Sequence, residues 1–333
     1  MTGGNLFIFN FDSKHMVKIF KNISDKKGIL YLLFKIGLFL LIFYCLDLMI
    51  GNVFARYYKK QNSGWEYRTR YAVEETNASI LIFGASRAQQ QYNPVYIEER
   101  LHQSSYNVGR DGEPIFYYYG VLKGILKRYT PSMIILDIEN GVFAEAQSSY
   151  DRLSILLPFY KTHPEMRTLI EMRSPFEKYK MLSNIYPYNS LLFKIANGNS
   201  ANNTKKFEDI KGYLPLTNSL TDPIHQVDVS KGYAIDSNKI NCYQSFIDDC
   251  KKNKIKLYIA CSPYYINLNG VDTSLLLAKK IANEKGIRFF DFSTDESFKR
   301  NAQLFDDTVH VNIFGAKIFT NQLIDSIQLQ EKK

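Results

Sequence analysis

Cysteine is scarce in this chain of 333 residues, which contains only four. Cys45 lies in an apolar run, and the spacing of Cys242, Cys250 and Cys261 resembles no metal site. Cys242 and Cys250 would lie ~12 Å apart along one predicted helix, too far for a disulfide, whereas a bond between Cys250 and Cys261 is geometrically conceivable. Free buried thiols are the simpler interpretation, because a chain of this length can bury a full core without a metal or a disulfide.

A surplus of basic residues is missing from most of the chain. Residues 61–333 carry 33 Lys and Arg against 30 Asp and Glu, an ordinary surface charge that predicts no nucleic-acid partner. The first predicted strand–helix turn lacks a glycine-rich phosphate loop, which argues against a nucleotide-binding domain. With 45% hydrophobic and 23% charged residues, the composition also excludes disordered, collagen-like and coiled-coil proteins.

The basic surplus surrounds the most apolar run of the chain, residues 29–50. Residues 1–60 hold nine Lys and Arg against three Asp. At ~1.5 Å per residue, the apolar run would span ~33 Å, about the thickness of a bilayer hydrocarbon core. We predict a basic N-terminal segment (1–28), a transmembrane helix (29–50) and a juxtamembrane linker (51–78).

The alternative for this run is a cleaved signal peptide. No small-residue cleavage site follows it, and residues 56–60 (RYYKK) are typical of an interfacial anchor, so we favour the uncleaved helix. The twenty residues on each side carry five basic side chains each. The positive-inside rule therefore does not decide the orientation.

Short apolar runs then alternate with helix-like segments. Strands are predicted at 79–83, 105–108, 133–138, 256–261 and 288–292, and helices at 94–101, 114–127, 237–252, 272–285 and 313–327. Apolar strands that alternate with amphipathic helices are typical of a parallel sheet covered on both faces. We predict a three-layer α/β domain with a five-stranded parallel sheet over residues 79–330.

Residues 141–233 interrupt this alternation between the third and fourth predicted strands. The segment is rich in Tyr, Asn and Pro, and it includes two turn-like stretches at 184–190 and 197–204. An insertion at the carboxyl end of a strand lies over the crevice where open α/β sheets bind ligands. We interpret it as a lid or substrate-recognition subdomain; the alternative is an insertion without such a role.

Two short motifs follow the first two predicted strands. The first strand ends in ILIFGAS, so Ser86 lies at a strand–helix turn, where its hydroxyl would project from the carboxyl edge of the sheet. A helix cap is the alternative role for this serine. The second strand is followed by NVGRDGE, whose Gly109 and Gly112 would let backbone amides approach a ligand, although a tight turn would need them as well.

Asp307 and His310 form the sharpest pattern, shortly before the last predicted helix. A carboxylate three residues before a histidine can fix one ring nitrogen and leave the other to deprotonate a nucleophile. Of the five histidines, His310 is the one with such a neighbour. The others are interpreted as residues without a catalytic role: His15, His102, His163 and His225.

Taken in order, GxS, NxGxxG and DxxH resemble the motifs of the SGNH/GDSL hydrolase superfamily over roughly residues 79–327, apart from the insertion 141–233. The resemblance implies a flavodoxin-like fold with Ser86 as the nucleophile and His310 as the general base and acid. It also implies Asp307 as the carboxylate that orients the histidine and Gly112 as an oxyanion donor. No metal or organic cofactor is implied.

One block departs from the family pattern. The family usually carries GxND after the third strand, with its Asn as an oxyanion donor, whereas Glu139 stands at that position here and Asn140 follows. Either Asn140 substitutes through a register shift, or the site relies on the amides of Ser86 and Gly112. Arg87, next to the nucleophile, either meets an anionic substrate or is a surface residue without that role.

A membrane helix before such a domain resembles the envelope branch of the superfamily. The layout is similar to that of the D-alanine transfer proteins of teichoic-acid modification and of alginate O-acetylation proteins, which work beside membrane-bound O-acyltransferases. The resemblance implies an extracytoplasmic C-terminal domain. It also implies an acylated glycan or other acyl ester as substrate, with the lipid bilayer and a membrane-bound O-acyltransferase as partners.

We therefore expect a membrane-anchored serine ester hydrolase or O-acyltransferase. The alternative is a catalytically silent, SGNH-like binding subunit of an O-acyltransferase system. Glu139 favours this alternative, whereas the complete set of Ser86, Asp307 and His310 opposes it.

Overall fold

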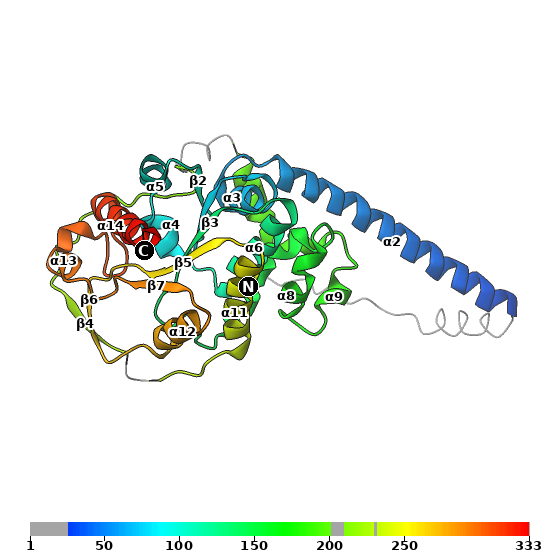
Figure 1. Ribbon diagram of the computed structural model, residues 1–333. Helices are drawn as coiled ribbons and strands as arrows, with labels where there is room; N and C mark the ends of the chain where they lie inside the picture. Colours follow the sequence, from blue (N-terminus) through cyan, green and yellow to red (C-terminus); the bar gives the residue numbers. More distant parts are fainter. Residues whose placement is uncertain (1–25, 201–209, 230–231, 333) are drawn as a thin grey trace, which may run out of the picture.

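A long helix projects from a compact α/β domain in the computed structural model (Figure 1). The structure describes residues 26–200, 210–229 and 232–332, so most of the predicted basic segment 1–28 and parts of the insertion lie outside the described residues. The helix, α2 (Lys26–Lys60), contains the predicted span 29–50 and continues for ten residues beyond it. By length and composition, it is the one helix in the described part that could cross a membrane.

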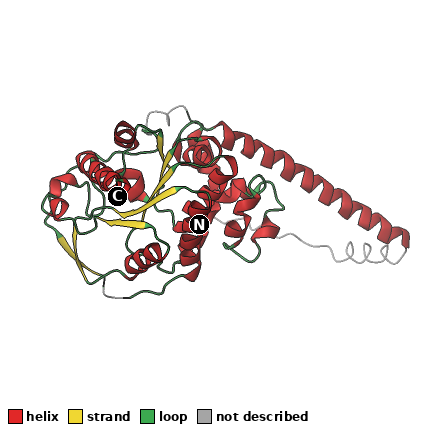
Figure 2. Ribbon diagram, viewed as in Figure 1, coloured by secondary structure: helices red, strands yellow, loops and turns green. Residues whose placement is uncertain are grey.

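A five-stranded parallel sheet forms the centre of the domain (Figure 2). Its strands, in the order β2-β1-β3-β5-β7, are β2 (Ser105–Asn107), β1 (Ile80–Phe83), β3 (Met133–Asp137), β5 (Lys256–Cys261) and β7 (Arg288–Asp291). This is the flavodoxin-like order, in which the chain leaves β1 in one direction and returns to its other side at β3. The predicted α/β fold and its five parallel strands are confirmed.

Helices cover both faces because successive strand residues point to opposite sides. In β1, Ile80 and Ile82 face a core shared with α4 (Ser86–Gln91), α5 (Pro94–Leu101) and α14 (Ile313–Glu331). Leu81 and Phe83 face the opposite core, shared with α6 (Ile115–Arg128), α11 (Ser237–Lys252) and α12 (Thr273–Glu284). Both faces of β1 are thus buried, which explains its uninterrupted apolar sequence.

The insertion consists of short helical pieces that pack on α6 and α2. They are α7 (Gln147–Asp151), η2 (Arg152–Phe159), η3 (Pro164–Met166), α8 (Arg167–Glu171), α9 (Glu177–Lys180), η4 (Tyr186–Leu191) and α10 (Leu192–Gly198). Two glycines of α6 permit this close packing: a Cβ on Gly120 would lie 2.5 Å from a methyl carbon of Leu156, and one on Gly124 would lie 2.4 Å from Met166.

Two short strands, a short helix and a 3₁₀ turn also belong to the domain. β4 (His225–Asp228) and β6 (Ile266–Asn269) form a separate two-stranded parallel sheet, which the sequence analysis did not predict. A short helix, α13 (Glu296–Lys299), and a 3₁₀ turn, η5 (Ala302–Leu304), precede the segment that carries His310.

The segment predicted as a linker, 51–78, differs from that expectation. Its first ten residues extend α2, and α3 (Gly64–Arg70) and a π-helical turn, η1 (Tyr71–Glu75), follow. Tyr58, Ala72 and Val73 are buried in the core, so these residues are structural parts of the domain. The sequence predicted a linker because the segment is polar. In the structure, several of its polar side chains are buried and hydrogen-bonded within the domain.

Candidate active site

Ser86 begins α4, directly after the carboxyl end of β1. The turn depends on Gly84, whose φ of +148° is unfavourable for other residues. A Cβ on Gly84 would also lie 2.6 Å from the Cβ of Ala88 and 3.0 Å from that of Asp137. The glycine therefore allows the chain to turn tightly enough to present the serine at the edge of the sheet.

A continuous hydrogen-bonded chain links Ser86, His310 and Asp307. His310 Nε2 lies 2.8 Å from Ser86 Oγ, and His310 Nδ1 lies 2.8 Å from Asp307 Oδ2. The other carboxylate oxygen, Asp307 Oδ1, accepts the backbone N–H groups of Val309 and His310, both at 2.8 Å. The structure thus brings together the three residues that the sequence analysis predicted as nucleophile, base and orienting acid.

Asp307 is held in its charged form by these contacts. Burial by itself would raise the pKa of Asp307, but the hydrogen bonds from the His310 ring and from two backbone N–H groups outweigh burial and lower it below its usual value. An ionised Asp307 can accept only, so Nδ1 of His310 carries the proton and Nε2 is left as the acceptor for the Ser86 hydroxyl.

The segment that carries His310 is held from several sides. The Gln91 side chain donates a hydrogen bond of 2.8 Å to the carbonyl of Val309, and the N–H of Tyr265 donates one of 3.0 Å to that of Thr308. Asn312 is fully buried and caps α14 by accepting the N–H groups of Phe314 and Gly315. These contacts fix the histidine relative to α4 and the serine.

The loop after β2 runs beside the serine turn. The N–H of Arg110 donates to the carbonyl of Gly84, and the buried Asn107 donates through its side chain to the carbonyls of Ala88 and Tyr92. Gly112 lies further along this loop with a φ of +67°. Among the described residues none accepts a hydrogen bond from its N–H, so the amide predicted as an oxyanion donor is uncommitted.

Glu139 and Asn140 follow β3 at the same edge of the sheet. The N–H of Asn140 donates to the Tyr264 hydroxyl at 3.0 Å, and its side-chain Oδ1 is buried without a hydrogen-bond partner among the described residues. Burial raises the pKa of Glu139 above its usual value, although the positive charge of Arg87 opposes the rise. An oxyanion role for either side chain stays a prediction.

Arg87 does not face solvent. It is 1% exposed, donates to the backbone carbonyls of Ser262 and Pro263, and stacks on the ring of Tyr264 at 3.6 Å. These contacts tie α4 to the chain that follows β5. Protein groups therefore surround the guanidinium, which holds α4 against the chain after β5. Neither of the expected roles, substrate contact or free surface residue, fits this buried position.

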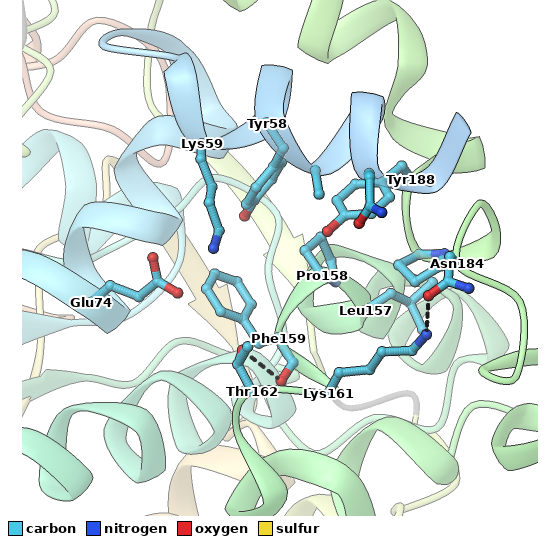
Figure 3. Close-up of a pocket in the computed structure, with 14 residues that line it drawn as sticks. Tyr58, Lys59, Glu74, Leu157, Pro158, Phe159, Lys161, Thr162, Asn184 and Tyr188 are labelled. Carbon is cyan, nitrogen blue, oxygen red and sulfur yellow. Dashed lines mark hydrogen bonds between the residues drawn. The ribbon is translucent and has the colours of Figure 1, made fainter. Parts of the chain in front are cut away.

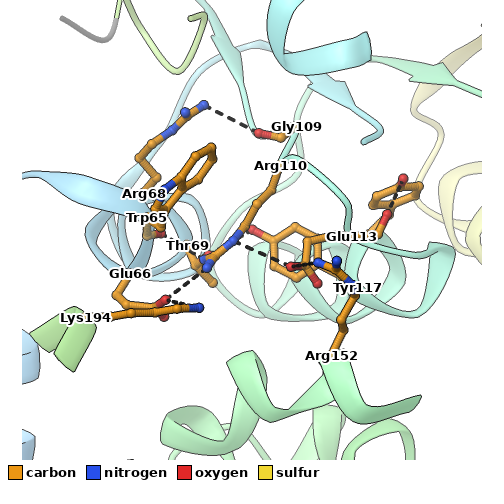
Figure 4. Close-up of polar contacts among 11 residues, drawn as sticks. Trp65, Glu66, Arg68, Thr69, Gly109, Arg110, Glu113, Tyr117, Arg152 and Lys194 are labelled. Carbon is orange, nitrogen blue, oxygen red and sulfur yellow. Dashed lines mark hydrogen bonds and ion pairs between the residues drawn. The ribbon is translucent and has the colours of Figure 1, made fainter. Parts of the chain in front are cut away.

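A buried charge cluster, centred on Arg110, joins the loop after β2 to α3 (Figure 4). Arg110 pairs with Glu66 at 2.9 Å and donates to the Trp65 carbonyl at 2.9 Å. Arg68, also on α3, donates to the carbonyl of Gly109 at 3.4 Å. Sequence reasoning missed this cluster because no spacing signal connects Glu66 with a residue forty-four positions away.

The insertion reaches the same loop through Arg152. A Cβ on Gly112 would lie 2.8 Å from Arg152 Nη1, and that guanidinium lies 3.5 Å from Glu113. Burial raises the pKa of Glu113 to about 7, against the opposing charges of Arg110 and Arg152. The residues predicted as an oxyanion loop therefore rest between α3 and the insertion.

Comparison with known proteins adds two structural likenesses. No family model matches the sequence, and no curated protein matches it. An acetyl xylan esterase shares 13% identity with a TM-score of 0.37, covering 74% of this chain and 99% of its own. A candidate acylhydrolase from Bacteroides fragilis shares 12% identity with a TM-score of 0.40, covering 81% and 99%. Scores this low leave function to be inferred from the residues of the site.

Within the described residues, no group of three His, Cys, Asp or Glu side chains is arranged to hold a metal ion. Cys242, Cys250 and Cys261 are buried free thiols, so the conceivable bond between Cys250 and Cys261 is not formed.

Proposed function

We propose that this protein is a membrane-anchored serine ester hydrolase or O-acyltransferase that acts on acyl esters of a cell-envelope glycan. The observation that carries the proposal is the continuous hydrogen-bonded chain from Ser86 through His310 to Asp307. The hydroxyl of an ordinary surface serine is not hydrogen-bonded to a base. The hydroxyl of Ser86 is bonded to His310, and Asp307 orients that histidine. This is the arrangement that activates a serine for attack on a carbonyl.

The chemistry follows from that arrangement. Ser86 Oγ attacks the acyl carbonyl carbon while His310 Nε2 takes its proton, and the ionised Asp307 stabilises the resulting imidazolium. The bond to the alcohol oxygen then breaks as His310 returns the proton to that oxygen, which leaves the acyl group on Ser86. Water completes hydrolysis, whereas a sugar hydroxyl completes acyl transfer.

The negative charge of the tetrahedral intermediate needs donors. The backbone N–H groups of Ser86 and Gly112 are proposed for this role, and the side-chain NH₂ group of Asn140 is a third candidate. Each donor of this kind typically contributes about 3 kcal/mol to transition-state stabilisation.

Membrane anchorage by α2, with the domain on the extracytoplasmic side, is part of the same proposal. None of the most apolar part of α2 is buried by the rest of the protein. An apolar surface of this length needs a bilayer or another protein to shield it from water. A membrane-bound O-acyltransferase would be a suitable source or acceptor of the acyl group.

A turnover assay on the full-length protein tests the proposal. The substrate is a chromogenic acetyl ester, assayed with and without an oligosaccharide acceptor, and the variants are Ser86→Ala, His310→Ala and the control Ser190→Ala, which removes an exposed hydroxyl of the insertion. We expect turnover in the wild type and the control only. Acetylated oligosaccharide among the products identifies a transferase, and acetate alone identifies a hydrolase.

A catalytically silent binding subunit is the second candidate. It is favoured by Glu139, whose carboxyl group stands where the family has an amide donor and would repel an oxyanion if ionised. Equal, background-level rates in the wild type and Ser86→Ala would support this candidate and contradict the enzyme.

A further inference from the structure

Four large apolar side chains of the insertion are exposed, and we call them the insertion patch. They are Phe176, Tyr179, Leu182 and Phe193, with exposed fractions of 67%, 60%, 75% and 92%. Single exposed apolar residues are ordinary, but several large ones within eighteen residues of sequence mark a surface that contacts something. The question is what covers them.

The insertion is fixed to α2 at a defined height. Asp47 of α2 accepts hydrogen bonds from the Ser183 hydroxyl at 2.5 Å and from the Asn184 N–H at 2.7 Å. One turn further along, a Cβ on Gly51 would lie 2.5 Å from Asn184, so the two backbones approach closely. The loop that follows Leu182 is therefore attached to the end of the apolar run.

A second attachment lies nearer the domain (Figure 3). Tyr58 of α2 is buried against the rings of Phe159 and Tyr188, beside a cavity of about 200 Å³. Asn199 donates to the carbonyl of Tyr57 at 2.9 Å. With contacts from Asp47 to Tyr58, the insertion cannot swing about α2, and the patch has a fixed position along the helix.

That position coincides with the expected membrane boundary. Residues 26–46 form the part of α2 before the attachment, and at ~1.5 Å per residue they span ~31 Å, about one hydrocarbon core. A groove of about 500 Å³ opens here between Phe43 and Leu46 of α2 and Tyr186 of the insertion. Leu182 of the patch directly precedes the attached Ser183, and in Figure 1 α9, which includes Tyr179, lies on the side of the domain from which α2 projects.

The composition of the patch suits the lipid–water interface. Tyr is enriched at this depth, Phe and Leu are typical of the buried face of interfacial segments, and lysines nearby favour lipid headgroups. Lys178 lies over the ring of Tyr179 at 4.9 Å, and Lys180 is exposed beside Tyr186. Apolar rings with amines at their edges are expected where acyl chains meet headgroups.

We propose that the insertion is seated in the interface of the bilayer that α2 crosses, with the insertion patch at the boundary between headgroups and acyl chains. This proposal rests on the membrane anchorage proposed above and goes beyond it. A single helix would leave the domain free to tilt, whereas a helix with a seated insertion holds the edge of the sheet that carries Ser86 at one height and orientation above the membrane.

Depth-dependent quenching on the full-length protein in nanodiscs tests this proposal. An environment-sensitive fluorophore is attached to Phe193→Cys in a Cys45→Ser background, and the lipids carry a spin label at the headgroup, near it, or deep in the acyl chain. Cys242, Cys250 and Cys261 do not compete for the fluorophore because they are buried and burial raises the pKa of each thiol. Phe176→Cys is a second patch variant.

Two control positions make the outcomes distinguishable. Leu38→Cys lies on the exposed apolar part of α2, and Leu276→Cys is 51% exposed on α12. We expect shallow-label quenching at Phe193→Cys and Phe176→Cys, deep-label quenching at Leu38→Cys and none at Leu276→Cys. Quenching at Leu38→Cys without quenching at either patch position overturns the seated insertion and leaves the anchor standing. Absence of quenching at all four positions overturns the anchor and the insertion together.

Discussion

At the scale of single residues, the proposed catalysis depends on how Asp307 uses its two carboxylate oxygens. One oxygen orients the His310 ring, and the other holds the backbone N–H groups of Val309 and His310. Asp307→Asn keeps the shape but lets the side chain donate to Nδ1, which favours the wrong tautomer. We expect ester turnover to fall by about 10³–10⁴-fold with little change in stability.

The neighbouring carboxylate provides the control for this prediction. Asp306 accepts a backbone N–H from Asn218 and does not contact His310 through its side chain. Asp306→Asn should therefore keep most of the activity. Similar losses in the two variants, measured as kcat/KM on one ester, would contradict the assigned role of Asp307.

Gly84 gives a second prediction at this scale. Gly84→Ala combines an unfavourable φ with a Cβ placed 2.6 Å from Ala88, whereas Gly141→Ala has a φ of +72° and meets nothing within 4 Å. We expect Gly141→Ala to lower the free energy of unfolding by about 1 kcal/mol and Gly84→Ala to lower it by at least ~3 kcal/mol. Chemical denaturation of both variants checks this, and equal losses would be evidence against a tight serine turn.

The raised pKa of Glu113 predicts that the stability of the fold depends on pH. Its pKa is raised from 4.5 to about 7 by burial, so the folded protein keeps a proton that the unfolded chain releases. The associated stability is full below about pH 4.5 and is lost as the pH rises through about 7. Glu113→Gln mimics the protonated form and removes this dependence.

We expect the difference in unfolding free energy, variant minus wild type, to rise by about 3 kcal/mol between those two pH values and to stay constant above them. Thermal denaturation across the range measures it. Parallel curves for the variant and the wild type would show that Glu113 titrates normally.

At the scale of elements, α3 and the loop after β2 are predicted to stabilise each other through Arg110. Arg110→Met leaves Glu66 buried without its main partner, and removing one member of a buried pair costs about 3–5 kcal/mol. Arg100→Met removes an exposed pair with Asp325 and should cost at most about 1 kcal/mol. Denaturant titration distinguishes the two, and a small loss for Arg110→Met would mean that α3 is only loosely attached.

The elements themselves were largely predictable from sequence. Apolar runs such as ILIF and MIILD are buried on both faces, so hydropathy alone located β1 and β3. In the structure, Asp236 and Asp272 cap α11 and α12, which begin within one residue of the predicted starts at 237 and 272. The pair of β4 and β6 was not predicted, because all four residues of β4 are exposed and the apolar–polar alternation of β6 covers only four residues. The helices of 51–78 were not predicted, because their polar side chains are buried against partners that are distant in the sequence.

At the scale of the whole molecule, the order of motifs along the chain predicted which residues meet. Parallel strands bring Ser86, the Gly112 loop and Asn140 to one edge because each follows a strand, and the DxxH segment before α14 approaches the same edge. The interior position of Arg87 could not be foreseen, because nothing in the sequence shows that the carbonyls of Ser262 and Pro263 surround it.

The attachment of the insertion to α2 also emerged only at this scale. Sequence patterns located the apolar run and the insertion separately, but Asp47 gave no sign that it would bind Asn184, far along the chain. The long helix, the insertion and the sheet edge consequently belong to one arrangement, and under the proposed anchorage the site has a set position relative to the membrane.

Labelling of the full-length protein with a fluorophosphonate, followed by peptide mapping, tests whether Ser86 is an activated nucleophile. We expect covalent labelling at Ser86 that is abolished in Ser86→Ala and His310→Ala and retained in Ser190→Ala. If the folded protein stays unlabelled while a known serine esterase reacts under the same conditions, Ser86 is not an activated nucleophile, and the catalytic account is contradicted.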